Sequence, residues 1–139
     1  MNIDKTISLA FNRAKEKNWD YVVFLIDIHD TIFKGTYSEI ENFEYLGKAK
    51  EALQLMSARK DIKIILWSST FNKRKYLLQL HKDNINIDTF NRNIIGIENT
   101  EIACFDEKPF FSVGIDNAFG FDAETDWEEV IKSLNNNQL

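Results

Sequence analysis

Two short apolar runs constrain the fold more than any other feature of the sequence. YVVFLID over Tyr21–Asp27 and IKIILWS over Ile62–Ser68 are rich in β-branched and aromatic residues and are too short for helices. Continuous apolar runs of this length are typical of strands covered on both faces. Between them, apolar residues fall at helical spacing over Glu44–Arg59. A strand, a helix and a second strand predict a right-handed crossover and a parallel sheet.

The other periodic segments extend this pattern to an α/β domain. We expect an outer helix over Asp4–Lys17, a third helix over Lys73–Asp83, a short strand over Ile87–Phe90, an irregular stretch over Asn91–Glu107, a last strand over Phe110–Asp116 and a final helix over Trp127–Leu134. Asp126 is suited to cap the final helix, and the NNNQ tail is expected to fray.

Composition favours one globular domain over residues 1–139. The chain is 44% hydrophobic and contains 5 Gly and 1 Pro. This composition argues against a disordered chain and against a collagen-like structure. A domain of this length buries roughly two thirds of its unfolded surface, which supplies a core without disulfides or structural metal. The lone Cys104 cannot form an internal disulfide and fits a reducing compartment.

Charge and hydropathy bear on location and partners. The longest apolar run, Tyr21–Ile26, is far shorter than a membrane span, and the start MNIDKT lacks the apolar core of a signal peptide. We therefore expect a cytoplasmic protein without membrane contact. The net charge of −5 indicates no general attraction of the chain for nucleic acid. A local basic binding site is the alternative that the net charge does not test.

Polar side chains end the predicted strands. Asp27 and Asp116 each close an apolar run, and Ser68 closes another. In an open parallel sheet, ligands bind in the crevice beyond the carboxyl ends of the strands, so these residues are expected to share a pocket. A carboxylate pair there suits Mg²⁺, which prefers oxygen ligands and often contacts a substrate phosphate.

Four short motifs occur in one order along the chain. DIHDTI begins at Asp27, Ser68 follows ILW, Lys108 stands in EKP, and Asp116 with Asn117 stands in GIDNAFGF. Together they resemble the signatures of the haloacid dehalogenase-like (HAD) phosphohydrolases, namely Asp-x-Asp-x-Thr, a Ser or Thr, a Lys and an acidic pair. The resemblance covers nearly all of the chain apart from the first expected helix.

The resemblance implies a Rossmann-like three-layer sandwich with a mostly parallel central sheet. It also implies that Asp27 is the nucleophile and becomes an aspartyl-phosphate. Thr31 and Ser68 would donate hydrogen bonds to phosphate oxygens, and Lys108 would offset negative charge. The implied Mg²⁺ ligands are Asp27, the backbone carbonyl of His29, Asp116 and Asn117.

Each matched residue also has a plainer interpretation. An Asp after a strand often forms a turn or caps a helix, and Thr31 is equally suited to a turn. Ser68 is suited to cap a helix. Lys108, which precedes Pro109, is equally suited to a solvated surface position. The order of the motifs favours the site over these alternatives.

His29 departs from the motif, which has a second Asp at this place. That Asp protonates the leaving group and then activates water in the phosphatases of the family. Imidazole is capable of both tasks near neutral pH. His29 therefore indicates either altered or lost catalysis, and we favour an active enzyme because the other matched residues remain. Asn117, in place of the usual second acid, is expected to weaken metal binding.

No segment is long enough for a folded cap domain. Only Phe33–Tyr45 and Asn91–Glu107 are available, which predicts an open crevice suited to large phosphorylated substrates. Aromatic residues in the first segment, at Tyr37, Phe43 and Tyr45, either line the entrance of the crevice or pack over the sheet, and we favour packing over the sheet. The sequence thus favours a Mg²⁺-dependent phosphohydrolase. The alternatives are a catalytically silent domain that binds a phosphorylated ligand or protein partner, and a nucleic-acid 3′-end phosphatase.

Overall fold

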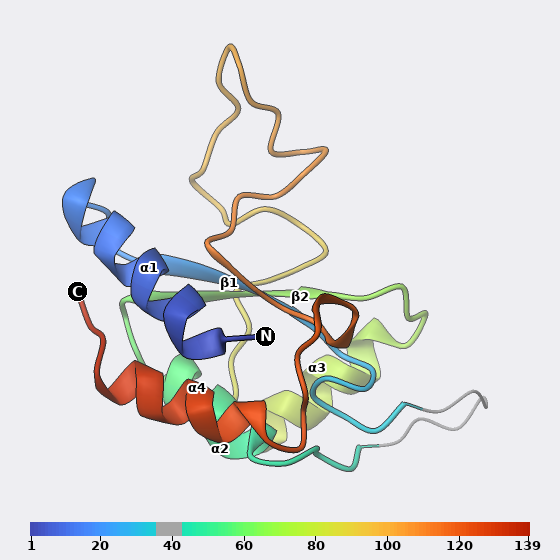
Figure 1. Cartoon of the computed structure of the whole chain (residues 1–139). Helices are drawn as coiled ribbons and strands as arrows, with labels where there is room; N and C mark the ends of the chain where they lie inside the picture. The colour runs from blue at the N-terminus through green and yellow to red at the C-terminus, as the bar shows by residue number, and fades with distance from the viewer. Residues whose placement is uncertain (36–42) are drawn as a thin grey trace.

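The computed structural model describes residues 1–35 and 43–139 (Figure 1). Its helices are α1 (Ile3–Glu16), α2 (Ala49–Ser57), α3 (Lys73–Lys82), the short 3-10 helix η1 (Asn117–Phe119) and α4 (Asp126–Asn135). Its strands are β1 (Val22–Asp27), β2 (Ile62–Trp67), β3 (Thr89–Phe90) and β4 (Val113–Ile115). No helix of the described ranges is long and apolar enough to cross a membrane.

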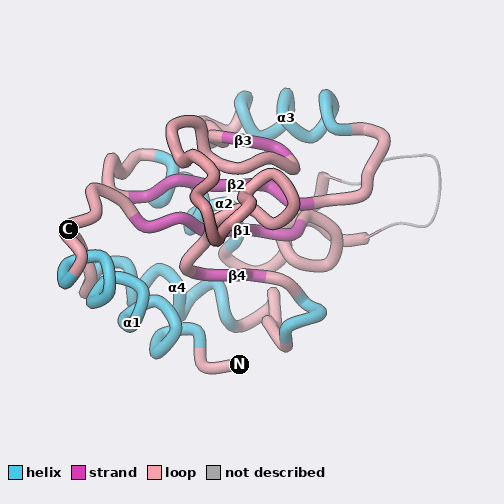
Figure 2. Tube along the Cα trace, turned by 90° about the horizontal axis from the view of Figure 1, so that it is seen from above, coloured by secondary structure: helices cyan, strands magenta, loops and turns pink. Residues whose placement is uncertain are grey.

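The strands form one four-stranded sheet in the order β3-β2-β1-β4, and every pairing is parallel (Figure 2). Strand β1 pairs with β2 along its whole length, from Val22 opposite Ile62 to Asp27 opposite Trp67. The predicted strand, helix and parallel strand unit is confirmed, since α2 connects β1 to β2. The fold is α/β and Rossmann-like, with helices flanking a parallel sheet.

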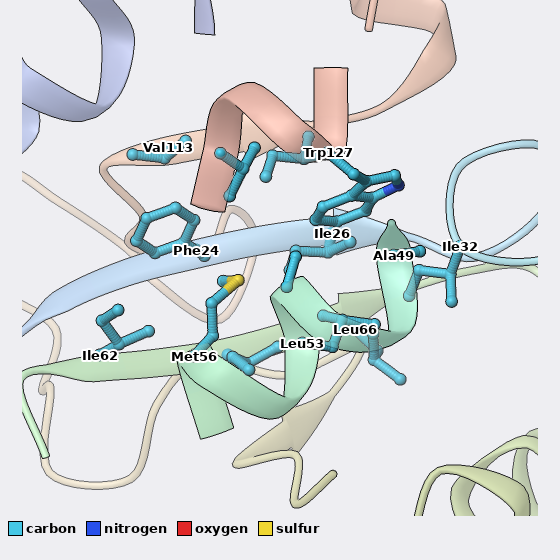
Figure 3. Packing of buried hydrophobic residues seen from close by; sticks show 14 of the residues in the cluster. Phe24, Ile26, Ile32, Ala49, Leu53, Met56, Ile62, Leu66, Val113 and Trp127 are labelled. Carbon is cyan, nitrogen blue, oxygen red and sulfur yellow. The ribbon is translucent and has the colours of Figure 1, made fainter. Parts of the chain in front are cut away.

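Side chains of β1 alternate between two hydrophobic clusters. Val22, Phe24 and Ile26 belong to the main core, whereas Val23 and Leu25 point into a smaller cluster on the other face. Figure 3 shows Leu53 and Met56 of α2 packed beside β1 in the main core. All the side chains of this strand up to Ile26 are buried, which is why its sequence has no polar alternation.

Segment 91–112 covers the other face of the sheet. It rises above the strands, opposite α2 and α4 (Figure 1), and contains neither helix nor strand. Its Ile94 packs on Val23, Leu25 and Ile65 in the smaller cluster, where the partly buried Phe111 joins them. An irregular segment thus supplies the third layer of the domain.

Helix α2 starts at Ala49, later than the predicted Glu44. The residues before it are extended because Lys34 N–H donates to the Glu44 carbonyl at 3.0 Å and Leu46 N–H donates to the Ile32 carbonyl at 2.9 Å. The predicted packing of Phe43 and Tyr45 is confirmed by their ring contacts with Phe33. Tyr37 lies outside the described residues.

The last strand is shorter than predicted, since only Val113–Ile115 pair with β1. Phe110, where we expected the strand to begin, donates its backbone N–H to the Asn93 side chain at 3.0 Å instead. The other expected elements differ from the observed ones by one or two residues at their ends, as is usual for helix and strand boundaries.

Two expectations for the C-terminus are wrong. Asp126 is the first residue of α4, and its carboxylate accepts from Asp122 N–H at 2.8 Å rather than capping the helix. The tail is held, because Arg59 donates to the carbonyls of Leu134 and Asn137, both at 2.6 Å. These contacts join the end of α2 to the end of the chain across a large sequence separation.

Arg59→Met is expected to lower the free energy of unfolding by about 2 kcal/mol, because it removes both the charge-assisted hydrogen bonds to the tail carbonyls and the bidentate pair with Asp61. Urea denaturation at pH 7 measures this. Lys132→Met is the control, since Lys132 forms an exposed pair with Glu129 and its loss should cost under about 0.5 kcal/mol. Equal stability of the two variants would show that the tail contacts contribute nothing.

Candidate active site

Two carboxylates meet at the carboxyl edge of the sheet. Asp27 is the last residue of β1, and Asp116 directly follows β4. The register pairs Ile26 with Ile115, so the two aspartates stand at the same level on neighbouring parallel strands. Adjacent strands are only about 4.8 Å apart. The prediction that the strand ends bring these two acids together is therefore confirmed by the pairing.

Burial and the neighbouring negative charge of Asp116 raise the pKa of Asp27 from 3.8 to about 6. Hydrogen bonds from Thr31 and from the backbone of Ile28, together with the charge of His29, act in the opposite direction and lower it. The carboxylate is thus ionised at neutral pH but is held in an unfavourable electrostatic environment. Such perturbed groups are frequent at functional sites.

Thr31 connects the two strand ends. Its buried hydroxyl donates to Oδ2 of Asp27 at 3.1 Å and accepts the backbone N–H of Asn117 at 3.1 Å. Its carbonyl accepts the indole N–H of Trp127 at 2.7 Å. The only hydroxyl proton of Thr31 goes to Asp27 in this arrangement, so Thr31 positions that carboxylate. Its contact with a phosphate stays a prediction.

Ser68 follows β2, one residue beyond Trp67, the register partner of Asp27. Asn91 fixes its backbone, accepting from Ser68 N–H at 2.8 Å and donating to the Ser68 carbonyl at 2.6 Å. The Ser68 hydroxyl accepts from Thr70 N–H at 3.2 Å in a local turn. The helix-cap interpretation of Ser68 is wrong, because α3 begins at Lys73 and its N-cap residue is Asn72. No acceptor for its proton occurs in residues 1–35 or 43–139, so the same hydroxyl is able to donate to a ligand.

His29 contacts a residue that the sequence did not single out. Its Nε2 lies 2.8 Å from the hydroxyl of Tyr76, and the two rings meet edge to face with centroids 5.4 Å apart. Tyr76 belongs to α3, is only 1% exposed and also packs against Phe33 and Phe43. Helical spacing with Leu80 is a signal for the burial of Tyr76, but nothing local predicts its partner.

Lys108 forms no ion pair with either aspartate in the described part of the chain. It is exposed in segment 91–112, and its Nζ lies 5.8 Å from the ring centroid of Phe111. The charges that shift the pKa of Asp27 come from Asp116 and His29. The role of Lys108 in offsetting negative charge at the strand ends stays a prediction.

The strand-end carboxylates have the chemistry of a Mg²⁺ site. Asp116 accepts Ala118 N–H on Oδ1 at 2.8 Å, and none of the described residues donates to its Oδ2. A divalent cation would also relieve the repulsion that raises the pKa of Asp27. Mg²⁺ needs only one or two protein carboxylates because water and phosphate supply the remaining ligands. The carboxylates of Asp27 and Asp116 therefore fit a Mg²⁺ ion. The described residues contain no group of three or more His, Cys, Asp or Glu side chains suited to a metal.

The comparisons with known proteins support the fold. No family model matches the chain, and no curated protein matches it. A solved structure of a conserved protein from Bacteroides thetaiotaomicron is similar, with a TM-score of 0.64 and 18% sequence identity. The match covers 86% of this chain and 93% of that one. At this identity, the likeness shows a shared fold alone.

Opposite shifts in the pKa of Asp27 are expected from two substitutions in the absence of metal. Asp116→Asn removes a neighbouring negative charge and should lower the pKa below about 6. Thr31→Val removes a hydrogen bond to the carboxylate and should raise it, whereas Thr31→Ser should restore it. Carboxyl ¹³C NMR titration measures these values.

Asp30→Asn is the matched control for this titration. The Asp30 carboxylate accepts from Gly35 N–H at 2.8 Å and is not among the groups that shift the pKa of Asp27. An unchanged Asp27 pKa in Asp116→Asn would contradict the close approach of the two acids.

Proposed function

We propose that the chain is a Mg²⁺-dependent phosphohydrolase of the HAD-like type, acting through an aspartyl-phosphate on Asp27. The observation that carries this function is the carboxylate pair at the ends of neighbouring strands β1 and β4, whose mutual repulsion calls for a cation. Further support comes from Ser68, whose hydroxyl stands at the same edge of the sheet. The motif order along the sequence agrees with this arrangement.

Asp27 is the attacking group. Above its pKa of about 6 it is mostly the carboxylate, which is the nucleophilic form. Thr31 holds Oδ2, so that Oδ1 is the oxygen that forms the bond to phosphorus while the bond to the leaving oxygen breaks. Ser68 donates to a nonbridging phosphate oxygen. When bound by Asp27 and Asp116, Mg²⁺ would supply the positive charge that offsets both carboxylates and the phosphate.

His29 takes the place of the family's acid and base. Its imidazole is oriented by Tyr76 through Nε2, and the tautomer decides which of the two groups donates. As a neutral ring it removes a proton from the water that hydrolyses the aspartyl-phosphate. In that neutral form it is a poor acid for the leaving group, which favours substrates whose leaving group departs as a stable anion.

The second candidate function is a silent domain that binds a phosphorylated ligand. Two observations favour it: Lys108 forms no ion pair with the aspartates among the described residues, and His29 replaces an acid. Such a domain would bind inorganic phosphate with Mg²⁺ but would not turn over an activated aryl phosphate. An open site for large substrates agrees with both functions.

Asp27→Asn should lose essentially all Mg²⁺-dependent turnover of p-nitrophenyl phosphate, because an amide does not attack phosphorus. The variant should also be more stable than the wild type at pH 7 without metal. Folding raises the pKa of Asp27, so the ionised wild type is penalised above about pH 6 and the penalty vanishes below about pH 4.

Thermal melts at pH 4 and pH 7 check the stability, and a colorimetric assay checks the turnover. Equal turnover by the wild type and a folded Asp27→Asn protein would contradict the proposed enzymatic function. Phosphate binding without wild-type turnover would support the silent domain.

The wild type is expected to hydrolyse aryl phosphates faster than alkyl phosphates by about 10²–10⁴-fold, the usual contribution of general acid catalysis. His29→Asp restores an acid and should increase alkyl phosphate turnover with less effect on aryl phosphate turnover. Steady-state rates on both substrate types measure the ratio. A folded, Mg²⁺-binding His29→Asp protein that stays inactive on both would favour the silent domain.

A further inference from the structure

Segment 91–112 is unusual for a domain of this size. It joins β3 to β4 without a helix or strand of its own. Connections longer than about 12–15 residues without secondary structure are uncommon in compact domains, and ordered examples often carry function. Its place on the sheet face away from α2 and α4 (Figure 1) gives it a surface of its own.

Two asparagine side chains hold this segment in shape. Asn93 donates to the Ile97 carbonyl at 3.0 Å and accepts the Phe110 N–H at 3.0 Å. Asn99 accepts the Phe105 N–H at 2.7 Å. These hydrogen bonds take the place of the backbone hydrogen bonds that a helix or strand would supply. They fix the positions of Phe105 and Phe110.

A cavity of about 440 Å³ lies between this segment and the residues that connect α1 to β1. The residues lining it are Asn18, Trp19, Asp20, Tyr21, Ile97, Glu98, Thr100, Phe105 and Phe110. Phe110 meets Trp19 edge to face at 5.3 Å and Phe105 at 6.0 Å between ring centroids. Aromatic walls with a few polar groups are characteristic of small-molecule sites.

This cavity is separate from the carboxylate pair. Tyr21, one of its lining residues, precedes β1, whereas Asp27 ends that strand. A strand rises about 3.3 Å per residue, which puts the two positions about 20 Å apart. The cavity therefore belongs to the amino edge of the sheet and to a different ligand.

The polar groups of the cavity define the charge of that ligand. Asp20 and Glu98 are exposed, and neither forms an ion pair with a described residue. No lysine or arginine is among the described residues that line the cavity. Lys17 lies over the Trp19 ring at 5.9 Å but is not among the lining residues, so Asp20 and Glu98 are the charged groups of the lining.

From this arrangement, we propose that the cavity binds a small aromatic compound carrying an ammonium group. The ring packs between Phe105, Phe110 and Trp19, where offset and edge-to-face contacts are available. The ammonium group lies beside the carboxylates of Asp20 and Glu98. This binding does not depend on phosphatase activity.

A series of three probes tests the proposal, each with a phenyl ring on a two-carbon chain: 2-phenylethylammonium, 2-phenylethanol and 3-phenylpropionate. ¹H–¹⁵N NMR titration of the full chain follows the Trp19 indole N–H and the amides of segment 91–112, with Trp19→Phe to assign the indole signal. The ammonium probe should bind about tenfold more tightly than the alcohol, since the carboxylates and ring faces each favour a cation. The carboxylate probe should bind most weakly.

Matched variants separate charge from shape. The double variant Asp20→Asn, Glu98→Gln should abolish the preference for ammonium over alcohol, while Glu101→Gln, in the same segment but outside the lining, should leave it unchanged. Phe105→Ala should weaken the binding of all three probes. Equal binding of the three probes, shifts confined to other parts of the chain, or no saturable binding would each overturn the proposal.

Discussion

Strand β1 is buried on both faces, and the other layers of the domain are arranged to cover it. Its alternate side chains divide between the main core and the smaller cluster under segment 91–112. Parallel pairing with β2 and β4 satisfies its backbone on both sides. A central strand of this kind has no exposed edge, so the chain places polar chemistry only where the strand ends.

The end of β1 combines opposing electrostatic effects. Burial and Asp116 favour the neutral form of Asp27, while Thr31 favours the carboxylate. The hydroxyl of Thr31 also holds the backbone of Asn117, and its carbonyl holds Trp127 of α4. The geometry of the carboxylate pair is therefore coupled to the packing of the last helix, and this packing holds the two acids together against their mutual repulsion.

The two edges of the sheet present different chemistry. The carboxyl edge carries acids and hydroxyls at strand ends, and the amino edge carries aromatic walls built from the end of α1 and segment 91–112. A parallel sheet creates this division because all its strands run in the same direction. A ligand at one edge needs no contact with the other.

Local patterns in the sequence determined the α/β architecture, the order of its elements and the place of Asp27, Asp116 and Ser68 at strand ends. They succeed because buried strands and amphipathic helices have distinct periodicities, and because parallel strands must end at one edge. Only the tertiary structure decided the contact of His29 with Tyr76, the position of Asn91 against the backbone of Ser68 and the attachment of the tail to Arg59. Each of these depends on how elements distant in sequence pack together, and the side chains involved have no local pattern that specifies a partner.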